Sequence, residues 1–288
     1  MELPPKPRQI HNLEFVRILT PYILSCHMVR GKSVLDVGCG LGHGSWLLAT
    51  NGAECVVAVD LNWAKVRQSF EHCASFRRFS ALVMDAQWLG FEDASFDVVA
   101  CFEVIEHVPQ PDKLLPELKR VLKTDGILIL TTPNRAVRLL PLQRPWNPEH
   151  LREYTLSALR RKLERHFPSF AILGIHGQPA LYGFYRNLWR QNPVRIYGSW
   201  IWHIFRAFVP YRVREWMKGK SNSTRALQSY AHLLDIAVPA PDPENWPFYA
   251  TTKSEGCLSF MAICSFDKQS VQKAINEIER TALKGNHS

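Results

Sequence analysis

Short, almost wholly apolar segments alternate with amphipathic segments along the first half of this chain. The apolar segments, each long enough for one strand, are residues 33–37, 55–60, 79–86, 95–102 and 127–134. Strands that are apolar on both faces are typical of a parallel sheet with helices packed on each side. The alternation therefore predicts an α/β fold, with helices over 61–74 and 111–126, the latter ended by Gly126.

The second half continues this pattern less regularly. Leucines at helical spacing predict a helix over 155–167, with Thr155 as its N-cap. The other elements expected here are two strands and a closing helix, over residues 170–177, 257–266 and 270–284. Residues 178–255 form a long insertion rich in aromatic and basic side chains.

Positive charge is concentrated in one part of the chain. The 288 residues carry a formal net charge of +9. Residues 135–220 alone hold sixteen Lys and Arg against four Asp and Glu. The basic character therefore describes one surface or insertion and not the fold as a whole.

The sequence lacks the marks of export and of membrane insertion. Its seven cysteines, an odd number without CxxC spacing, fit reduced thiols better than disulfides or a zinc site. The opening residues lack the basic-then-apolar order of a signal peptide, and no apolar run approaches the ~20 residues of a membrane-spanning helix. We therefore expect a cytoplasmic protein.

The turn after the first strand is rich in glycine. The stretch VLDVGCGLGHGS, residues 34–45, has glycine at positions 38, 40, 42 and 44. Glycines at a strand-to-helix turn let a ligand approach the backbone and its N–H groups. Asp36, two residues before Gly38, would repel a pyrophosphate but would suit a ligand with a cationic amino-acid end. The motif favours such a ligand, with a nicotinamide-dependent oxidoreductase as the alternative.

Two further carboxylates follow the next predicted strands. Asp60 ends the second strand, 20 residues after Gly40, where one carboxylate can accept hydrogen bonds from two ribose hydroxyls. Asp85 ends the third strand and can accept from an adenine amine, while Ala86 leaves room for the ring. Because ligands of open α/β sheets lie beyond the carboxyl ends of the strands, these residues predict one nucleoside-binding edge.

Taken in order, these segments resemble the motifs of a known enzyme family. VLDVGCGLGHGS, AVD, MDA, FDVVACFEVIEHV and LKRVLKTDGILILTTPN are similar to the successive motifs of class I S-adenosylmethionine-dependent methyltransferases, in the type 11 group. The resemblance covers residues 30–135. It implies a Rossmann-like sheet of seven strands, mostly parallel with an antiparallel last strand and helices on both faces, and S-adenosyl-L-methionine as the cofactor.

The resemblance also implies roles for individual residues. Gly38 and Gly40 would contact the methionine part of the cofactor and Asp60 its ribose, while Asp85 and Ala86 would hold the adenine. Phe102 would lie beside the methionine part. The cofactor-binding residues expected on this basis are Asp36, Gly38, Gly40, Asp60, Leu61, Asp85, Ala86 and Phe102.

The domain organisation follows from the same resemblance. It implies a single methyltransferase domain over residues 1–288, with a cofactor-binding core at 30–135. Residues 136–165 and 178–255 would form a helical and irregular cap on the acceptor side.

Two segments outside the core resemble relatives from sugar and polysaccharide biosynthesis. They are HNLEFVRILTPYIL, within a helix predicted over 10–30, and NPEHLREYTLSAL, after the fifth strand. In such relatives the second segment covers the acceptor pocket. Arg17 of the first would either reach the cofactor carboxylate or lie solvated on the helix face.

Three titratable side chains follow the fourth strand in CFEVIEHV, residues 101–108. Glu103, Glu106 and His107 have the spacing that lies on one face of a helical turn. Quinone-ring O-methyltransferases share this spacing and can bind a divalent ion there, and oxygen ligands would favour magnesium. His107 is otherwise a general base, or a structural histidine bonded to a carbonyl. We expect His107 to be the catalytic residue and no metal to be obligatory.

The expected activity is O-methylation of a small-molecule, sugar or glycan, or lipid-linked acceptor. Residues 196–220 mix tryptophan with arginine and lysine, which suits a lid over the enzyme or peripheral contact with the inner membrane face. Nucleic acid is the least favoured partner. Besides the oxidoreductase, the remaining alternative is a regulatory protein that binds the cofactor without turnover.

Overall fold

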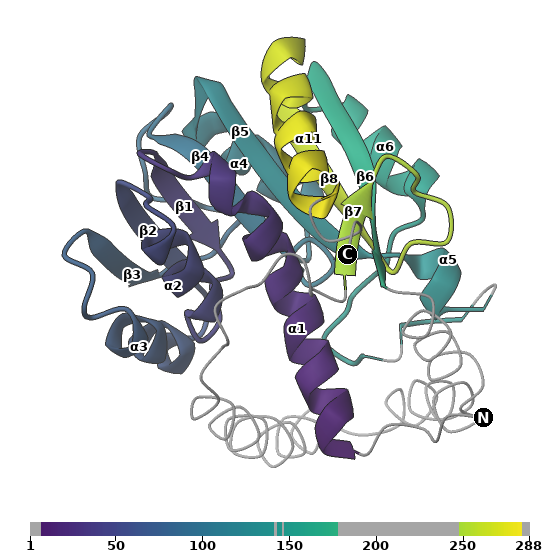
Figure 1. Ribbon diagram of the computed structural model, residues 1–288, viewed down its shortest axis with the longest axis horizontal. Coiled ribbons are helices and arrows are strands. Elements are labelled where there is room, and N and C mark those ends of the chain that lie inside the picture. The colour runs from purple at the N-terminus through teal and green to yellow at the C-terminus, as the bar shows by residue number, and fades with distance from the viewer. Residues whose placement is uncertain (1–6, 141–142, 146, 178–247, 284–288) are drawn as a thin grey trace.

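A mixed β-sheet of eight strands runs through the protein (Figure 1). The computed structural model describes residues 7–140, 143–145, 147–177 and 248–283. In chain order the strands are β1 (Ser33–Val37), β2 (Cys55–Asp60), β3 (Phe79–Val83), β4 (Phe96–Phe102), β5 (Leu122–Pro133), β6 (Ser169–Gly177), β7 (Phe248–Thr251) and β8 (Ser259–Ser265). They lie side by side in the order β3-β2-β1-β4-β5-β8-β6-β7.

The strand directions agree with the sequence prediction. The first five strands are parallel to one another. The last strand, β8, is antiparallel to both β5 and β6, and β7 is antiparallel to β6. The mostly parallel sheet is therefore confirmed, with one strand more than the seven expected. The additional strand is β7. It lies within residues 178–255, which the sequence assigned to the cap, but it pairs with β6 and extends the edge of the sheet.

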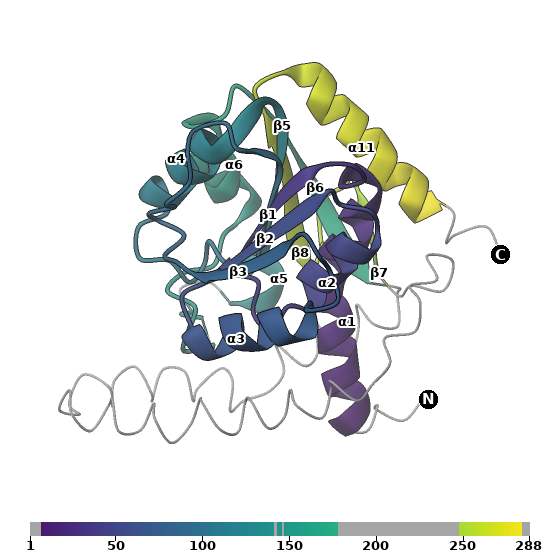
Figure 2. The ribbon, with the colours of Figure 1, turned by 90° about the vertical axis from the view of Figure 1, so that its left-hand side faces the viewer.

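Helices cover both faces of the sheet (Figure 2). They are α1 (Pro7–Ser25), the short 3₁₀ helix η1 (Cys26–Met28), α2 (His43–Thr50), α3 (Trp63–His72), α4 (Pro111–Val121), α5 (Arg135–Arg138), α6 (Leu156–Glu164) and α11 (Lys268–Leu283). Figure 2 shows α1, α2 and α11 on one face and α4 and α6 on the other. The two helical layers predicted from the alternating segments are therefore confirmed, as is the Rossmann-like architecture that the family resemblance implies.

Side-chain caps set the starts of two helices. Thr155 is the N-cap of α6, as predicted, and its hydroxyl accepts a hydrogen bond from the Ala158 N–H at 3.3 Å. Asn62 caps α3 in the same way, with its side-chain oxygen accepting from Ala64 N–H at 2.9 Å. Such caps satisfy N–H groups that have no partner within the helix.

Helix α4 ends earlier than its sequence suggests. It stops at Val121, and Leu122 already belongs to β5, so Gly126 is not a helix stop. A Cβ added at Gly126 would lie 2.9 Å from the Lys123 carbonyl oxygen and 3.0 Å from that of Asp97. Glycine at this position lets β5 begin in close contact with neighbouring backbone.

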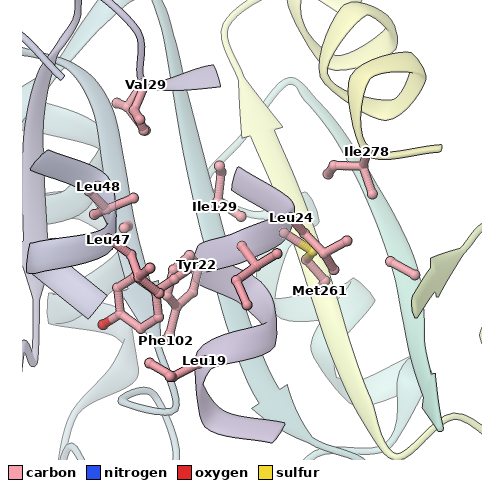
Figure 3. Close-up of a cluster of buried hydrophobic side chains, with 14 of the residues drawn as sticks. Leu19, Tyr22, Leu24, Val29, Leu47, Leu48, Phe102, Ile129, Met261 and Ile278 are labelled. Atoms are coloured by element: carbon pink, nitrogen blue, oxygen red, sulfur yellow. The ribbon is translucent and has the colours of Figure 1, made fainter. Parts of the chain in front are cut away.

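The core on the α1 face joins α1 to α2 and to the sheet (Figure 3). Leu19, Tyr22 and Leu24 of α1 are buried beside Leu47 and Leu48 of α2. The same cluster includes residues from β4, β5, β8 and α11, namely Phe102, Ile129, Met261 and Ile278. Burial of these apolar side chains holds α1 against β4, β5 and β8.

The close approach of α1 and α2 generates a stability prediction for Gly44→Ala. Alanine favours a helix over glycine by about 1 kcal/mol, so propensity alone predicts stabilisation. A Cβ at Gly44 would lie 2.1 Å from Cζ of the buried Tyr22 ring, and such overpacking costs about 1–3 kcal/mol. We expect the clash to dominate and to lower the free energy of unfolding by up to about 2 kcal/mol, measured by urea denaturation.

The matched control is Gly90→Ala. A Cβ at Gly90 would make an ordinary contact, 3.6 Å from Met84 Cε. This variant should stay within about 0.5 kcal/mol of wild type. Equal stability of the Gly44 and Gly90 variants would contradict the close packing of α1 on α2.

Candidate functional site

The glycine-rich loop lies against the carboxyl end of β2. The N–H groups of Gly38 and Cys39 donate to the Val59 carbonyl oxygen at 2.7 and 3.0 Å. The Gly40 N–H donates to Asp60 Oδ2 at 3.1 Å. Two predicted cofactor residues that are 20 positions apart in the sequence are therefore in direct contact.

One of the four loop glycines faces open space. A Cβ added at Gly40 would meet no atom within 4 Å in the part of the chain that the structure describes. At Gly38, Gly42 and Gly44 it would lie 2.3, 2.6 and 2.1 Å from the nearest side-chain atom. Packing therefore requires glycine at these three positions, and Gly40 is where a ligand can approach the backbone.

Asp36 is fully buried near the end of β1. Its Oδ1 accepts a hydrogen bond from the Tyr22 hydroxyl at 3.1 Å and its Oδ2 accepts one from the Ser45 hydroxyl at 2.6 Å. Burial raises the pKa of Asp36 to about 6, an effect that the two hydrogen bonds partly offset. Both oxygens are engaged inside the protein, so any influence of Asp36 on a ligand at the loop is exerted through its charge.

Asp60 and Leu61 lie at the rim of the loop. Asp60 Oδ1 accepts from the Asn62 N–H at 2.9 Å, while Oδ2 accepts from Gly40. Leu61 is 71% exposed, so a large apolar side chain stands next to the carboxylate. A carboxylate and an exposed apolar side chain therefore lie next to each other at this rim.

Asp85 and Ala86 follow β3 at the same edge of the sheet. Asp85 Oδ1 accepts from the Gln87 backbone N–H at 2.9 Å and from its side-chain amide at 3.1 Å. The Gln87 side-chain oxygen accepts from the Gln110 N–H at 3.0 Å. Gln87, to which the sequence analysis assigns no role, thus ties the segment after β3 to the segment after β4.

Phe102 ends β4 and is buried under α1. Its ring packs edge to face on Tyr22, with a centroid distance of 4.6 Å and an interplanar angle of 89°. Tyr22 therefore contacts both Phe102 and Asp36. Tyr22 is not among the residues predicted for the site, and its only signal in the sequence is a tyrosine among the apolar residues of α1.

Glu103 and Glu106 have different hydrogen-bond partners. Its φ is +56°, in the left-handed region that costs a residue with a side chain about 1–3 kcal/mol. Glu103 Oε2 accepts from Arg17 Nη1 at 3.1 Å, and Oε1 accepts from the Thr131 hydroxyl at 3.2 Å. Arg17 is 6% exposed and also donates to the Ser259 hydroxyl at 3.1 Å, so the solvated alternative for Arg17 is wrong.

Glu106 is completely buried. Its Oε2 accepts from the Thr132 hydroxyl at 3.0 Å, whereas Oε1 has no hydrogen-bond partner among the described residues. Burial, followed by the charge of Glu103, raises the pKa of Glu106 well above its ordinary value. One oxygen of the carboxyl group is therefore hydrogen-bonded, and the other is buried without a partner among the described residues.

His107 and His150 bring two rings next to Glu106. His107 Nδ1 lies 3.0 Å from the Glu149 carbonyl oxygen. A carbonyl only accepts, so Nδ1 carries the proton and Nε2 is the acceptor of the neutral ring. Burial and the neighbouring His150 lower the pKa of His107. The two rings are perpendicular, with centroids 4.7 Å apart.

Hydrogen bonds between two loops hold this cluster together. The Leu151 N–H donates to the Glu106 carbonyl oxygen at 2.9 Å. The Arg152 guanidinium donates to the carbonyl oxygens of Val108 and Pro109. The segment around His150 is therefore fixed against the turn that follows β4.

His150 is not among the residues predicted for the site. In the sequence it lies in NPEHLREY, within the predicted acceptor cap, 43 positions after His107. The available signal is that both histidines follow parallel strands, whose carboxyl ends share one edge of the sheet.

Residues 35–130 match a family described as a methyltransferase domain. A probable S-adenosylmethionine-dependent methyltransferase of Mycolicibacterium smegmatis is 34% identical over 153 residues, which are 53% of this chain and 58% of that protein. A ubiquinone biosynthesis O-methyltransferase of Pasteurella multocida is 32% identical over 147 residues, 46% of this chain and 58% of that protein. The chain thus spans somewhat over half the length of the curated relatives it matches.

Two solved structures are similar in fold. The YcgJ protein from Bacillus subtilis has a TM-score of 0.52 and 18% identity, covering 86% of this chain and 99% of that one. The [4+2]-cyclase SpnF has a TM-score of 0.50 and 16% identity, covering 87% of this chain and 81% of that one. At these identities the likeness concerns the fold alone.

The buried Asp36 generates a pH prediction. Its pKa in the folded state, about 6, lies above the ordinary value of 3.8, so its stabilising contribution is complete below about pH 4 and is lost as the pH rises through 6. The difference between the two pKa values corresponds to about 3 kcal/mol. The free energy of unfolding of wild type should fall by roughly that amount, relative to Asp36→Asn, between pH 4 and pH 7 in urea titrations.

Asp97→Asn is the control. Asp97 is partly buried, which raises its pKa, but hydrogen bonds from Ser33 and Lys123 outweigh this effect and lower the pKa to about 2. Its stabilising contribution is therefore constant above about pH 4 and is lost as the pH falls toward 2. The same pH dependence for both variants between pH 4 and 7 would refute the assignment to Asp36.

Proposed function

The chain contains a domain of the class I S-adenosylmethionine-dependent methyltransferase family, in the type 11 group, and from this premise we propose that the protein transfers the methyl group of S-adenosylmethionine to an oxygen atom. The acceptor is a small molecule that offers a hydroxyl group. Sugar or glycan hydroxyls and hydroxylated rings, free or linked to a lipid, are the leading classes.

The observation that carries this proposal is the direct contact between the glycine loop and Asp60. Gly40 is open to a ligand and its N–H lies 3.1 Å from Asp60 Oδ2. In the proposed complex, Gly38 and Gly40 meet the methionine part of the cofactor, while Asp60 and Leu61 meet the ribose.

The remaining cofactor contacts lie along the same edge. Asp85 and Ala86, after β3, hold the adenine, and Phe102, at the end of β4, lines the methionine side. In this arrangement each strand end that carries a motif contacts one part of the cofactor.

The buried Asp36 favours this cofactor over a dinucleotide. A carboxylate close to the glycine loop repels a pyrophosphate but attracts the ammonium group of a methionine part. The carboxylate is fully buried, and solvent screens it less than it would an exposed charge. The nicotinamide-dependent alternative is therefore the weaker of the two.

The proposed reaction is an in-line displacement at the sulfonium methyl carbon. The acceptor oxygen forms a bond to this carbon as the carbon–sulfur bond breaks, and S-adenosylhomocysteine leaves with the bonding electrons. Alignment of the two reactants supplies much of the acceleration. His107 takes the acceptor proton at Nε2, because its Nδ1 already donates to the Glu149 carbonyl.

The acceptor class rests on the relatives. Ubiquinone biosynthesis O-methyltransferases are among the similar proteins, which supports a hydroxylated ring as acceptor. Membrane contact through residues 196–220 lies outside the described residues. Among the helices that are described, none combines the length and the apolar character needed to cross a membrane.

Asp60→Asn tests cofactor binding. Hydrogen bonds to a charged group contribute about 1.5–3 kcal/mol, so loss of the carboxylate should weaken S-adenosylhomocysteine binding by at least about 10-fold in calorimetry. Asp125→Asn, at an exposed position on β5, is the control and should bind as wild type does. Tight NAD binding by wild type, or unchanged affinity of Asp60→Asn, would contradict the proposal.

His107→Ala tests the acceptor side. Loss of a general base should lower kcat by about 10²–10⁴-fold while S-adenosylhomocysteine affinity stays the same. Exposed His27→Ala serves as the control for histidine removal. The assay transfers a radiolabelled methyl group to glycan, quinone and lipid extracts. No labelling by wild type in any extract would favour the regulatory alternative, and full activity of His107→Ala would make this histidine structural.

A further inference from the structure

Three side chains on two loops converge on one small volume beyond the ends of β4 and β5. Glu106, His107 and His150 each offer one ligand atom, and these atoms all lie within 4.8 Å of one another. A single cation placed among three such atoms can reach bond lengths of about 2.0–2.2 Å to nitrogen and oxygen with small side-chain movements.

The carboxylate of this group has an unused oxygen. Glu106 is fully buried, and its Oε1 has no hydrogen-bond partner among the described residues, although a buried oxygen without a partner is costly. Its other oxygen is held by the Thr132 hydroxyl at 3.0 Å. The side chain is therefore held through one oxygen, and the other has no partner among the described residues.

Both histidines are oriented as metal ligands are. His107 Nδ1 bonds to the Glu149 carbonyl oxygen at 3.0 Å, and His150 Nδ1 bonds to Glu153 Oε1 at 2.9 Å. Ligating histidines commonly donate their second ring N–H to a carbonyl or carboxylate, which leaves the other nitrogen free to bind the ion. Here the nitrogen left over in each ring is Nε2.

The support for His150 is itself buried and charged. The Glu153 side chain has no exposed surface, and its Oε1 lies 3.4 Å from Arg138 Nε as well as within hydrogen-bond distance of His150. A carboxylate behind a ligating histidine raises the basicity of the ring. Arg138 and Glu153 thus set the orientation of His150.

Glu103 is not one of the three residues that could bind the cation. Its carboxylate is bonded to Arg17 at 3.1 Å and to the Thr131 hydroxyl at 3.2 Å. The oxygen-rich set of Glu103, Glu106 and His107 suggested by the sequence is therefore split. The set that the structure assembles has two nitrogens and one oxygen.

We infer that Glu106, His107 and His150 bind one divalent transition-metal cation, such as Zn²⁺ or Co²⁺, in preference to Mg²⁺. Imidazole nitrogens suit these ions, whereas Mg²⁺ prefers a set of oxygen ligands. A cation held here would supply Lewis-acid polarisation of an acceptor hydroxyl. The inference concerns binding, goes beyond the proposed methyl transfer and does not depend on it. Because Nε2 of His107 cannot hold a cation and accept a proton at once, the general-base role proposed above applies to the metal-free protein and the ligand role to the metal-loaded protein.

The test is titration of the metal-free full-length chain with Co²⁺, followed by calorimetry and by visible absorption of the bound ion. We expect one saturable site per chain, and Mg²⁺ binding at least about 10-fold more weakly. His150→Ala and Glu106→Gln should each weaken Co²⁺ binding by about 100-fold or more, and Glu153→Gln by about 10–100-fold. Glu103→Gln, the matched control, should stay within about 2-fold of wild type, since it is not a ligand.

Several results would overturn the inference. They are absence of a saturable site in wild type, unchanged affinity of His150→Ala, equal weakening by Glu103→Gln and Glu106→Gln, or Mg²⁺ binding as tight as Co²⁺. Circular dichroism of each variant and its affinity for S-adenosylhomocysteine provide a separate check of folding. Because that affinity reports on the other side of the site, failure of the metal inference stays distinguishable from failure of the proposed function.

Discussion

The buried carboxylate of Asp36 is the group on which the proposed cofactor side depends. A charge without solvent is costly unless it is hydrogen-bonded, and here two hydroxyl donors from α1 and α2 meet its two oxygens. One of those donors, Tyr22, also packs on Phe102 and occupies the space that a Cβ at Gly44 would need. The polar and apolar contacts of this tyrosine thus fix α1, α2 and the ends of β1 and β4 relative to one another, which sets the shape of the glycine loop.

Directly after β4, two acidic side chains take different hydrogen-bond partners. The left-handed backbone at Glu103 sends its carboxylate toward Arg17, whereas Glu106, three residues later, is buried against Thr132. Two acidic groups that are close in sequence therefore have different partners. Glu103 joins the sheet to α1, and Glu106 belongs to the group that includes the two histidines.

Much of the cofactor side could be predicted from the sequence because periodicity and glycine spacing are local properties. The strands, the capping role of Thr155 and the meeting of Gly40 with Asp60 at one edge all follow from patterns within short segments. The position of His150 could not be predicted in this way. It depends on hydrogen bonds between two loops more than forty residues apart, such as Leu151 to Glu106, and no periodicity encodes them. The edge strand β7 was missed for a similar reason, because its pairing with β6 is set by tertiary contact across a long insertion.

The two sides of the site also differ in how they are built. The family match ends at residue 130, inside β5, whereas Arg138, His150 and Glu153 lie beyond it. The proposed cofactor side consists of strand ends, whose positions the sheet fixes, and the proposed acceptor side consists of loops fixed by side-chain and backbone hydrogen bonds. Loops of this kind accept substitution without disturbing the sheet, so one cofactor-binding frame can serve many acceptors. The choice of acceptor is therefore to be sought in the contacts of residues 147–153 with the turn after β4.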